Sequence, residues 1–431
     1  MGRHARHSEP DMGGTHYRAT PDYHRGQDSY KRPSPTSART TIPTRNRYNT
    51  ALGTVIENLK TDPEPFMRVF YSTLFALDFS IRDLFPTSMR QQNSRFVRGL
   101  IYILESIDTA AADSSRLDEL SEFLGELGRD HRKYGVTAAH YDTMTRALQQ
   151  TLAHVMKNEW TQTLNDAVTS AFTTASKVMN TAAETDEYPA RVEGTVLETM
   201  RIGRNVVVVR LQLDQAIDYL PGQYMAVQVP QCPNTWRYLS AAIPANDSGL
   251  IEFHVRTIPN GYCSRQVVTN TRAGDRWILG RPRGQLHNAV TSNKPVCMVA
   301  RNVALSAMRC ILLDMVQARK SNPLVDIYYG AEFPGELFDA STLANLQASN
   351  PWLIVHICAD EKQDPWWLKD APALPSNLRL RQGSPLELAI ADGSVHGRTV
   401  IVGGGMALVN KAEEALPRFG VDPRDIHHDP L

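Results

Sequence analysis

The feature that most constrains the fold of this chain is a change in the spacing of its apolar residues near residue 186. Before that point apolar side chains recur every three or four residues, which predicts amphipathic helices. After it they fall in short runs bounded by Gly and Pro, which predicts strands. Because the two spacings occupy separate blocks, the chain should fold as several domains of different classes.

Residues 46–185 are predicted to form an all-helical domain, with helices near 48–59, 65–75, 96–104, 117–127, 141–155 and 165–179. Residues 186–291 contain short strands punctuated by turns, which favours a small antiparallel β-barrel. In residues 292–431 strands alternate with helical stretches, which predicts an α/β domain with a parallel sheet covered on both faces. The expected fold class is therefore multidomain, in the order all-α, antiparallel barrel, α/β.

Composition excludes several classes of function. Formal net charge is zero, so the overall balance gives no reason to expect nucleic-acid binding. We find no apolar run near the roughly 20 residues that span a bilayer, and no secretory signal. The five cysteines lack CxxC spacing, which favours reduced thiols in the cytoplasm over disulfides or a zinc site. Residues 1–45 are rich in Pro, Ser, Thr, His and Arg, and we expect them to be a disordered tail.

One segment of the helical block suggests a metal ligand. His131 lies between two helical patterns, at the end of the run Leu127-Gly-Arg-Asp-His131, and Tyr141 opens the next helix ten residues later. A histidine on one helix that faces polar residues on another is a common way to hold haem iron. The alternative is an exposed histidine at a helix end, where a cationic side chain suits the helix dipole.

The helical block resembles a globin, and is most similar to the globin domain of flavohaemoglobins. The resemblance rests on Phe70-Tyr71-Ser-Thr-Leu-Phe75, on Arg82-Asp-Leu-Phe85-Pro86, and on the ten-residue step from His131 to Tyr141. It implies haem b, with His131 as the proximal iron ligand and Phe85 packed on the haem.

The same resemblance implies that Tyr71 and Gln92 are distal residues that hydrogen-bond bound O₂, and that Tyr141 supports the proximal histidine. The alternatives are that Tyr71 packs in the core and that Gln92 lies on a solvated helix face. Gln91 is the alternative candidate for the role assigned to Gln92. Two positions depart from the family: Ala183 stands where a glutamate is usual, with Glu184 beside it, and Asp130 stands where a lysine is common.

Residues 188–290 resemble the FAD domain of the ferredoxin-NADP reductase superfamily. The resemblance rests on Pro221-Gly-Gln-Tyr224, Trp236-Arg-Tyr-Leu-Ser240, Gly261-Tyr-Cys-Ser264 and the turn around Gly274–Gly284. It implies that FAD contacts the following residues: Tyr224, Arg237, Tyr238, Ser240, Gly261 and Ser264. Leu239 stands at the usual tyrosine position of the Arg-x-Tyr-Ser motif. Tyr238, one residue earlier, is expected to face the other way on a strand.

The last block resembles the NAD(P)H domain of the same superfamily, but its glycine-rich turn is degraded. The family's Ala-Gly-Gly-Thr-Gly-x-x-Pro appears as Ala300-Arg-Asn-Val-Ala-Leu-Ser-Ala307. Side chains therefore project where bare backbone approaches the dinucleotide. The family's later Cys-Gly-Pro-Pro signature appears as Val402-Gly403-Gly404-Gly405, so its Cys is missing, while Gly403 and Gly404 remain permissive. NAD(P)H binding is thus possible but altered, and Arg301 is a candidate to capture a phosphate.

Together these resemblances imply a flavohaemoglobin-like oxidoreductase that passes electrons through FAD to haem iron. The activity implied is nitric oxide dioxygenation, with O₂ and NO as small-molecule ligands and an electron donor that the sequence leaves unknown. One alternative is a haem-flavin oxidoreductase with a donor other than NAD(P)H, such as a small organic acid or a partner protein. Another is a non-enzymatic gas or redox sensor.

Overall fold

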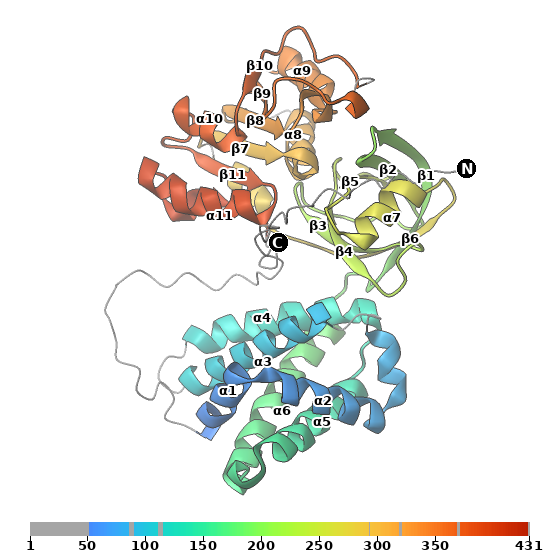
Figure 1. Cartoon of the computed structure of the whole chain (residues 1–431), viewed down its shortest axis with the longest axis vertical. Coiled ribbons are helices and arrows are strands. Elements are labelled where there is room, and N and C mark those ends of the chain that lie inside the picture. Colours follow the sequence, from blue (N-terminus) through green and yellow to red (C-terminus); the bar gives the residue numbers. More distant parts are fainter. Residues whose placement is uncertain are drawn as a thin grey trace, which may run out of the picture.

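The structure is a computed structural model that describes residues 51–85, 90–110, 115–292, 294–318, 321–368 and 371–429. It confirms the expected order of a helical part, an antiparallel barrel and an α/β part, which follow one another along the chain (Figure 1). The tail predicted for residues 1–45 lies outside the described residues. No helix in the described ranges combines the length and the apolar character that crossing a membrane requires.

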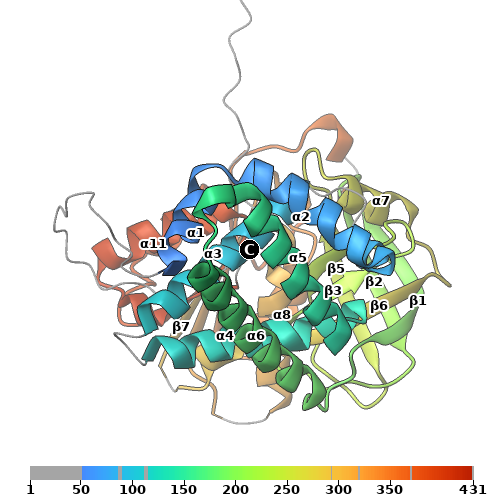
Figure 2. The same ribbon diagram turned by 90° about the horizontal axis from the view of Figure 1, so that it is seen from below.

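The helical part is built from long helices that pack across one another (Figure 2). They are α1 (Ala51–Thr61), α2 (Pro63–Leu77), α3 (Arg90–Ala110), α4 (Ser115–His131), α5 (Ala138–Met156) and α6 (Gln162–Glu184). Each expected helix is present, and most extend beyond the apolar run that predicted them. The extension of α4 puts His131 at its last residue, followed by a 3₁₀ turn at Arg132–Tyr134.

Two glycines fix the position of α4. Gly135 ends the 3₁₀ turn with φ +75°, a left-handed conformation that glycine adopts without strain. At Gly128 an added Cβ would lie 2.1 Å from the Met179 carbonyl oxygen of α6. Only glycine therefore permits α4 to cross α6 this closely, and that crossing sets the direction of the helix that carries His131.

The helical part has two groups of buried apolar side chains. The larger group surrounds Phe66, Phe70, Leu104 and Leu152, and the smaller group contains Leu124, Tyr141 and Met179. Ile107 packs against both groups. Tyr71 lies at the edge of the first group and Tyr141 belongs to the second, so the residues expected on the two sides of a haem lie in different parts of the core.

Residues 192–283 form a six-stranded antiparallel sheet in the order β4-β3-β6-β1-β2-β5. Its strands are β1 (Val192–Ile202), β2 (Val206–Leu213), β3 (Tyr224–Gln228), β4 (Trp236–Ser240), β5 (Leu250–Arg256) and β6 (Arg276–Arg283). A bridge between Ala241 and Phe253 joins the two edge strands and closes the barrel. A helix that the sequence reading missed, α7 (Tyr262–Asn270), packs on β5 and β2.

The last part is a six-stranded parallel sheet in the order β10-β9-β8-β7-β11-β12. Its strands are β7 (Val296–Arg301), β8 (Val325–Ala331), β9 (Leu353–Ala359), β10 (Leu380–Gln382), β11 (Thr399–Gly403) and β12 (Ile426–His427). Its helices are α8 (Leu305–Gln317), α9 (Ala340–Ser349), α10 (Pro385–Ala391) and α11 (Met406–Ala415). Helices α8 and α9 share a core with one face of the sheet, and α10 and α11 with the other.

Candidate cofactor sites

His131 presents one ring nitrogen for a ligand. Its Nδ1 lies 2.6 Å from the Leu127 carbonyl oxygen, one turn earlier in α4, so that Nδ1 donates the hydrogen bond. Nε2 then carries the lone pair, and it has no hydrogen-bond partner among the described residues. Burial lowers the pKa of His131, which favours the neutral imidazole that binds metals. This arrangement suits an axial iron ligand.

Tyr71 supplies a buried donor on α2. Its hydroxyl is out of contact with solvent and has no hydrogen-bond partner within the described parts of the chain. Its ring lies among aromatic rings, 5.2 Å from Phe70, 5.7 Å from Phe75 and 5.6 Å from Phe85 between centroids. Burial raises the pKa of Tyr71, so the phenol stays protonated and can donate. An unpaired buried hydroxyl costs stability, which is consistent with a position that a ligand completes.

The side chain of Gln92, expected beside Tyr71, lies outside the described side chains, although its backbone belongs to α3. Asn93, which sequence reasoning did not single out, has a buried Oδ1 with no partner in the described chain. Phe96, one turn later on the same face, stacks on Phe70 at 4.7 Å. Asn93 therefore lies on the face of α3 that packs against α2, the helix that carries Phe70 and Tyr71.

Tyr141 stands next to His131, with 6.4 Å between their ring centroids. Its hydroxyl is also buried without a partner among the described residues, and burial raises the pKa of Tyr141 to about 12. Glu184, which is adjacent to the position where the family has a glutamate, accepts a hydrogen bond from Asn180 at 2.7 Å on the surface. The structure therefore provides the tyrosine without the carboxylate partner.

The structure brings five of the expected cofactor residues to one cavity of about 120 Å³ between the barrel and the α/β part. They come from two strands of the barrel and from the end of β11: Tyr224, Tyr238, Ser240, Gly403 and Gly404. The rings of Tyr224 and Tyr238 meet edge to face at 5.2 Å. Aromatic rings beside bare glycine backbone form a surface that suits a flat, partly polar ring system.

Tyr238 and Leu239 face opposite ways on β4, as expected, and the face that carries Tyr238 is the one that lines the cavity. Tyr238 and Ser240 are two residues apart on β4, so they share a face, and both line the cavity. Leu239 packs against the barrel core instead. Arg237 does not line the cavity: its guanidinium is exposed and donates to the Trp236 carbonyl oxygen at 2.9 Å.

Gly261 and Ser264 form a tight turn at the start of α7, apart from the cavity. The Ser264 hydroxyl accepts a hydrogen bond from the Ile258 amide at 3.0 Å and lies 3.4 Å from the Gly261 carbonyl oxygen, to which it donates. A Cβ on Gly261 would lie 2.7 Å from the Ser264 oxygen. The glycine is thus required by the turn itself, while the turn leaves backbone amides at a helix N-terminus.

At the end of β7 the degraded turn keeps its backbone shape. Asn302 has φ +53°, a conformation that favours the glycine found there in the family. Arg301 does not present a free guanidinium, since it pairs with Asp360 through two hydrogen bonds, one of them 3.2 Å long. Ala304 and Ala307, at the other altered positions, line the same cavity as Gly403.

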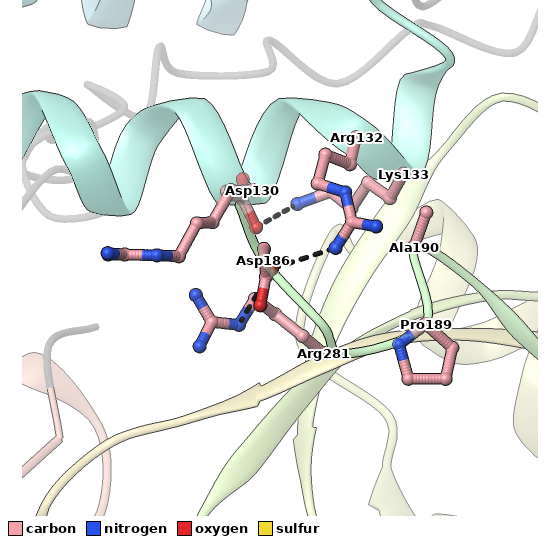
Figure 3. A pocket seen from close by; sticks show the side chains of 8 residues that line it. Asp130, Arg132, Lys133, Asp186, Pro189, Ala190 and Arg281 are labelled. Atoms are coloured by element: carbon pink, nitrogen blue, oxygen red, sulfur yellow. Dashed lines mark hydrogen bonds and ion pairs between the residues drawn. The ribbon is translucent and has the colours of Figure 1, made fainter. Parts of the chain in front are cut away.

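Ion pairs join the helical part to the barrel beside His131 (Figure 3). Arg132 pairs with Asp186 at 2.9 Å and donates to the Tyr188 carbonyl oxygen at 2.6 Å. Arg281 of β6 approaches Asp186 at 3.9 Å and Glu126 of α4 at 3.6 Å. The end of α4 is therefore held against the barrel by side chains from both sides.

A second buried network joins the barrel to the α/β part. Glu252 of β5, 2% exposed, accepts hydrogen bonds from Arg210 at 2.5 Å, His254 at 2.9 Å and Arg309 of α8 at 2.8 Å. Burial alone would raise the pKa of Glu252, but these partners lower it to about 2. The carboxylate therefore stays ionised and ties α8 to the barrel next to the cavity.

Comparison with known proteins agrees with this architecture. The globin family model matches residues 68–179, and the oxidoreductase FAD-binding domain model matches residues 193–288. A flavohemoprotein of Vibrio cholerae is 23% identical over 382 residues, which cover 84% of this chain and 91% of that protein. The crystal structure of a Malassezia yamatoensis flavohemoglobin with bound FAD and heme superposes with a TM-score of 0.66 at 14% identity, covering 88% of this chain and 96% of that one.

The chain also matches bacterial reductase components. The ferredoxin–NAD(P)(+) reductase component of the naphthalene 1,2-dioxygenase and salicylate 5-hydroxylase systems of a Ralstonia species is 27% identical over 252 residues, 57% of this chain and 72% of that protein. The chain spans about half the length of other bacterial reductase components that it matches. The chain therefore has the domain order of the flavohaemoglobins that it resembles, with a globin domain ahead of a FAD-binding oxidoreductase domain.

Proposed function

We propose that this oxidoreductase passes electrons through FAD to haem b iron, and that its reaction is the dioxygenation of nitric oxide with O₂. The proposed domains are the globin domain at 46–185, the FAD-binding barrel at 186–291 and the NAD(P)-binding-like domain at 292–431. The turn from Thr185 to Arg191, between α6 and β1, supports the first boundary. Five cysteines, all buried and unpaired, support a reducing, cytoplasmic location.

One observation carries the proposal. The globin domain contains a histidine whose Nδ1 is fixed by the Leu127 carbonyl, and a buried tyrosine hydroxyl that has no partner in the described chain. Buried polar groups are almost always hydrogen-bonded, so an orphaned hydroxyl is consistent with a partner, such as a ligand or a water molecule, that the described residues do not supply. A haem held by His131 and contacted by Tyr71, Gln92 and Phe85 would satisfy both positions.

Each side chain has a separate task in this proposal. The hydrogen bond to Leu127 holds the His131 ring in one tautomer and directs Nε2 away from its own helix. Tyr71 keeps its proton because burial raises its pKa, so its hydroxyl offers a donor to a diatomic ligand. Tyr141 restrains the His131 ring from the side without a carboxylate partner. When bound, haem supplies the iron centre for the gas reaction and FAD supplies the electrons that re-reduce it.

The barrel residues likewise offer groups that would contact a flavin. Tyr224 and Tyr238 offer ring faces and edges, Ser240 offers a hydroxyl, and Gly403 and Gly404 leave room for a ring close to backbone. Arg237, exposed at the edge of β4, and the Gly261–Ser264 turn remain the proposed contacts for the pyrophosphate.

The proposed reaction can be tested without knowing the natural donor. The purified holoprotein would be reduced anaerobically with a chemical reductant, mixed with O₂, and then mixed with NO in a stopped-flow instrument. We expect ferric haem and one nitrate per haem in the first turnover, with repeated turnover while reductant lasts. Capture of NO without nitrate would rule out dioxygenation and favour a gas sensor.

A second function, haem-flavin electron transfer from a donor other than NAD(P)H, is favoured by the Arg301–Asp360 ion pair at the end of β7. Adding NADH or NADPH anaerobically to the holoprotein distinguishes a nicotinamide donor from a different donor. Rapid bleaching of the flavin followed by haem reduction supports nicotinamide as the donor. Cofactors that remain oxidised support a different donor.

A further inference from the structure

A buried lysine follows the proximal histidine by two positions. Lys133 is 2% exposed, and its Nζ donates to Asp130 Oδ1 at 2.6 Å (Figure 3). Asp130 is itself 8% exposed and also pairs with Arg283 of β6 at 3.3 Å. A buried ammonium is tolerated when it is paired in this way, but salt bridges of this kind are weak evidence for stability alone.

The Lys133 side chain extends from the globin domain onto the barrel. An added Cβ on Gly280 of β6 would lie 3.3 Å from Lys133 Cδ, so the aliphatic stem runs over a strand position that has no side chain. The ammonium nitrogen lies 4.9 Å from the centre of the Tyr134 ring. It lies 5.7 Å from the ring centres of both Trp236 and Tyr238 on β4. These distances are within the range of cation–π contacts.

The rings around this ammonium connect the two candidate cofactor sites. Tyr134 lies 6.1 Å from His131 and 6.0 Å from Trp236 between ring centroids. Tyr238, which contacts the same ammonium, lines the cavity proposed for the flavin. The Lys133 carbonyl oxygen also accepts a hydrogen bond from Arg191, just ahead of β1. Residues of the barrel thus contact both backbone and side-chain atoms of the residues that follow His131.

We propose that Lys133 is a positioning residue that fixes the His131 end of α4 against the flavin-site strand β4, and so sets the geometry for electron transfer between the two cofactors. The inference rests on the proposed haem and FAD sites. Each transfer oxidises the reduced flavin by one electron and reduces one ferric iron by one electron, and no bond forms or breaks. Lys133 carries no electron; it holds the two sites in register.

The test uses the full-length holoprotein with Lys133→Met, which keeps an unbranched apolar side chain and removes the ammonium. Flash reduction of the flavin, followed by the rise of ferrous-haem absorbance, measures the intramolecular rate. We expect that rate to fall about tenfold or more, because small misplacements of reacting groups have large kinetic effects. Haem and FAD contents should stay unchanged. Lys177→Met, an exposed lysine on α6, is the matched control and should leave the rate unchanged.

Hydrogen exchange gives a readout that does not depend on electron flow. Residues 129–136 and 236–240 should exchange faster in Lys133→Met and not in Lys177→Met. The double variant Asp130→Asn with Lys133→Met removes both members of the pair, so the result is not obscured by a buried carboxylate that has lost Lys133 and keeps only Arg283. In a double-mutant cycle with Trp236→Leu, the rate losses should be less than multiplicative, since both variants break one contact.

The outcomes separate the two proposals. If the unmodified protein shows no flavin-to-haem transfer, the proposed function fails. If it transfers electrons and the Lys133 variants transfer them equally fast with unchanged exchange, the positioning role is overturned while the proposed function stands. Slower transfer with multiplicative losses at Lys133 and Trp236 would also overturn it, because the two residues would then act independently.

Discussion

Arg301 and Asp360 form a two-point ion pair that spans the carboxyl ends of β7 and β9. Strand β8 lies between these two strands in the sheet, so the pair crosses the end of β8. In open α/β sheets ligands bind in the crevice at this edge. The guanidinium that the sequence offered as a phosphate ligand is therefore engaged by a carboxylate, which adds negative charge where a dinucleotide phosphate would approach.

The first prediction concerns this edge. Arg301→Gly combined with Asn302→Gly should increase the rate at which NADH reduces the flavin, because the change removes two side chains from a turn that already has the required backbone. Anaerobic stopped-flow absorbance measures the rate. Arg381→Gly, which breaks a similar two-point pair with Asp392 in the same domain, is the control and should have no effect. An unchanged rate in the double variant would refute the steric explanation.

The second prediction concerns the iron ligand. His131→Ala should abolish the Soret absorbance of the purified protein while FAD absorbance remains, because in the proposed site one imidazole supplies the axial bond and the proposed flavin site lies in another domain. His154→Ala, at an exposed position on α5, should leave both spectra intact. Normal haem content in the His131 variant would assign the ligand elsewhere.

The third prediction concerns Tyr71. Tyr71→Phe should leave the cofactor-free protein as stable or slightly more stable, since an unpaired buried hydroxyl costs about 1–3 kcal/mol. The ferrous holoprotein should nevertheless release O₂ roughly tenfold faster, which corresponds to a hydrogen bond of about 1.4 kcal/mol. Thermal unfolding and stopped-flow dissociation give the two values. Tyr102→Phe, on α3 beside Phe123, is the control for loss of a tyrosine hydroxyl.

The fourth prediction concerns the flavin cavity. Tyr238→Ala should weaken FAD retention roughly fivefold to tenfold, since an aromatic contact contributes about 1 kcal/mol beyond its buried area. Tyr238→Phe keeps the ring and should retain FAD. Equilibrium dialysis, read by flavin fluorescence, measures the difference. Equal retention by the alanine and phenylalanine variants would show that the ring does not contact the flavin.

The fifth prediction concerns pH. The pKa of Glu252 is about 2 in the folded chain against about 4.5 when unfolded, so ionised Glu252 stabilises the fold fully above pH 4.5. As pH falls from 4.5 to 2 the unfolded chain binds a proton first, and about 3 kcal/mol of stability is lost. Urea unfolding at several pH values measures this loss. Glu252→Gln should flatten the dependence, while Glu387→Gln, in an exposed pair with Lys411, should not.

Local patterns in the sequence were sufficient to predict most of the secondary-structure elements and their order along the chain. The three- and four-residue spacing of apolar side chains predicted every helix from α1 to α6, and the βα alternation predicted the parallel sheet. The sequence pattern does not indicate helix α7, because the motif at residues 261–264 is typical of a turn and the helix begins within it at Tyr262. The length of α4 was underestimated, because polar residues at its end, up to His131, give no apolar signal.

The sites depended on contacts that local patterns do not contain. Sequence spacing placed Tyr238 and Leu239 on opposite faces of β4, but which face lines the cavity depends on how that strand pairs with β3. Asp130 read as a departure from its family, yet in the structure it joins Lys133 to Arg283 of the barrel. The Asp130–Arg283 pair joins residues more than a hundred positions apart.

The sequence by itself determined the three domain classes and the altered turn after β7, because each depends on neighbouring residues and their backbone preferences. Only the tertiary structure decided that Arg301 is neutralised by Asp360, that Tyr238 shares a cavity with Gly403, and that Lys133 extends between domains. The physical reason is that side-chain pairing across domains is set by packing, and packing depends on the whole folded chain.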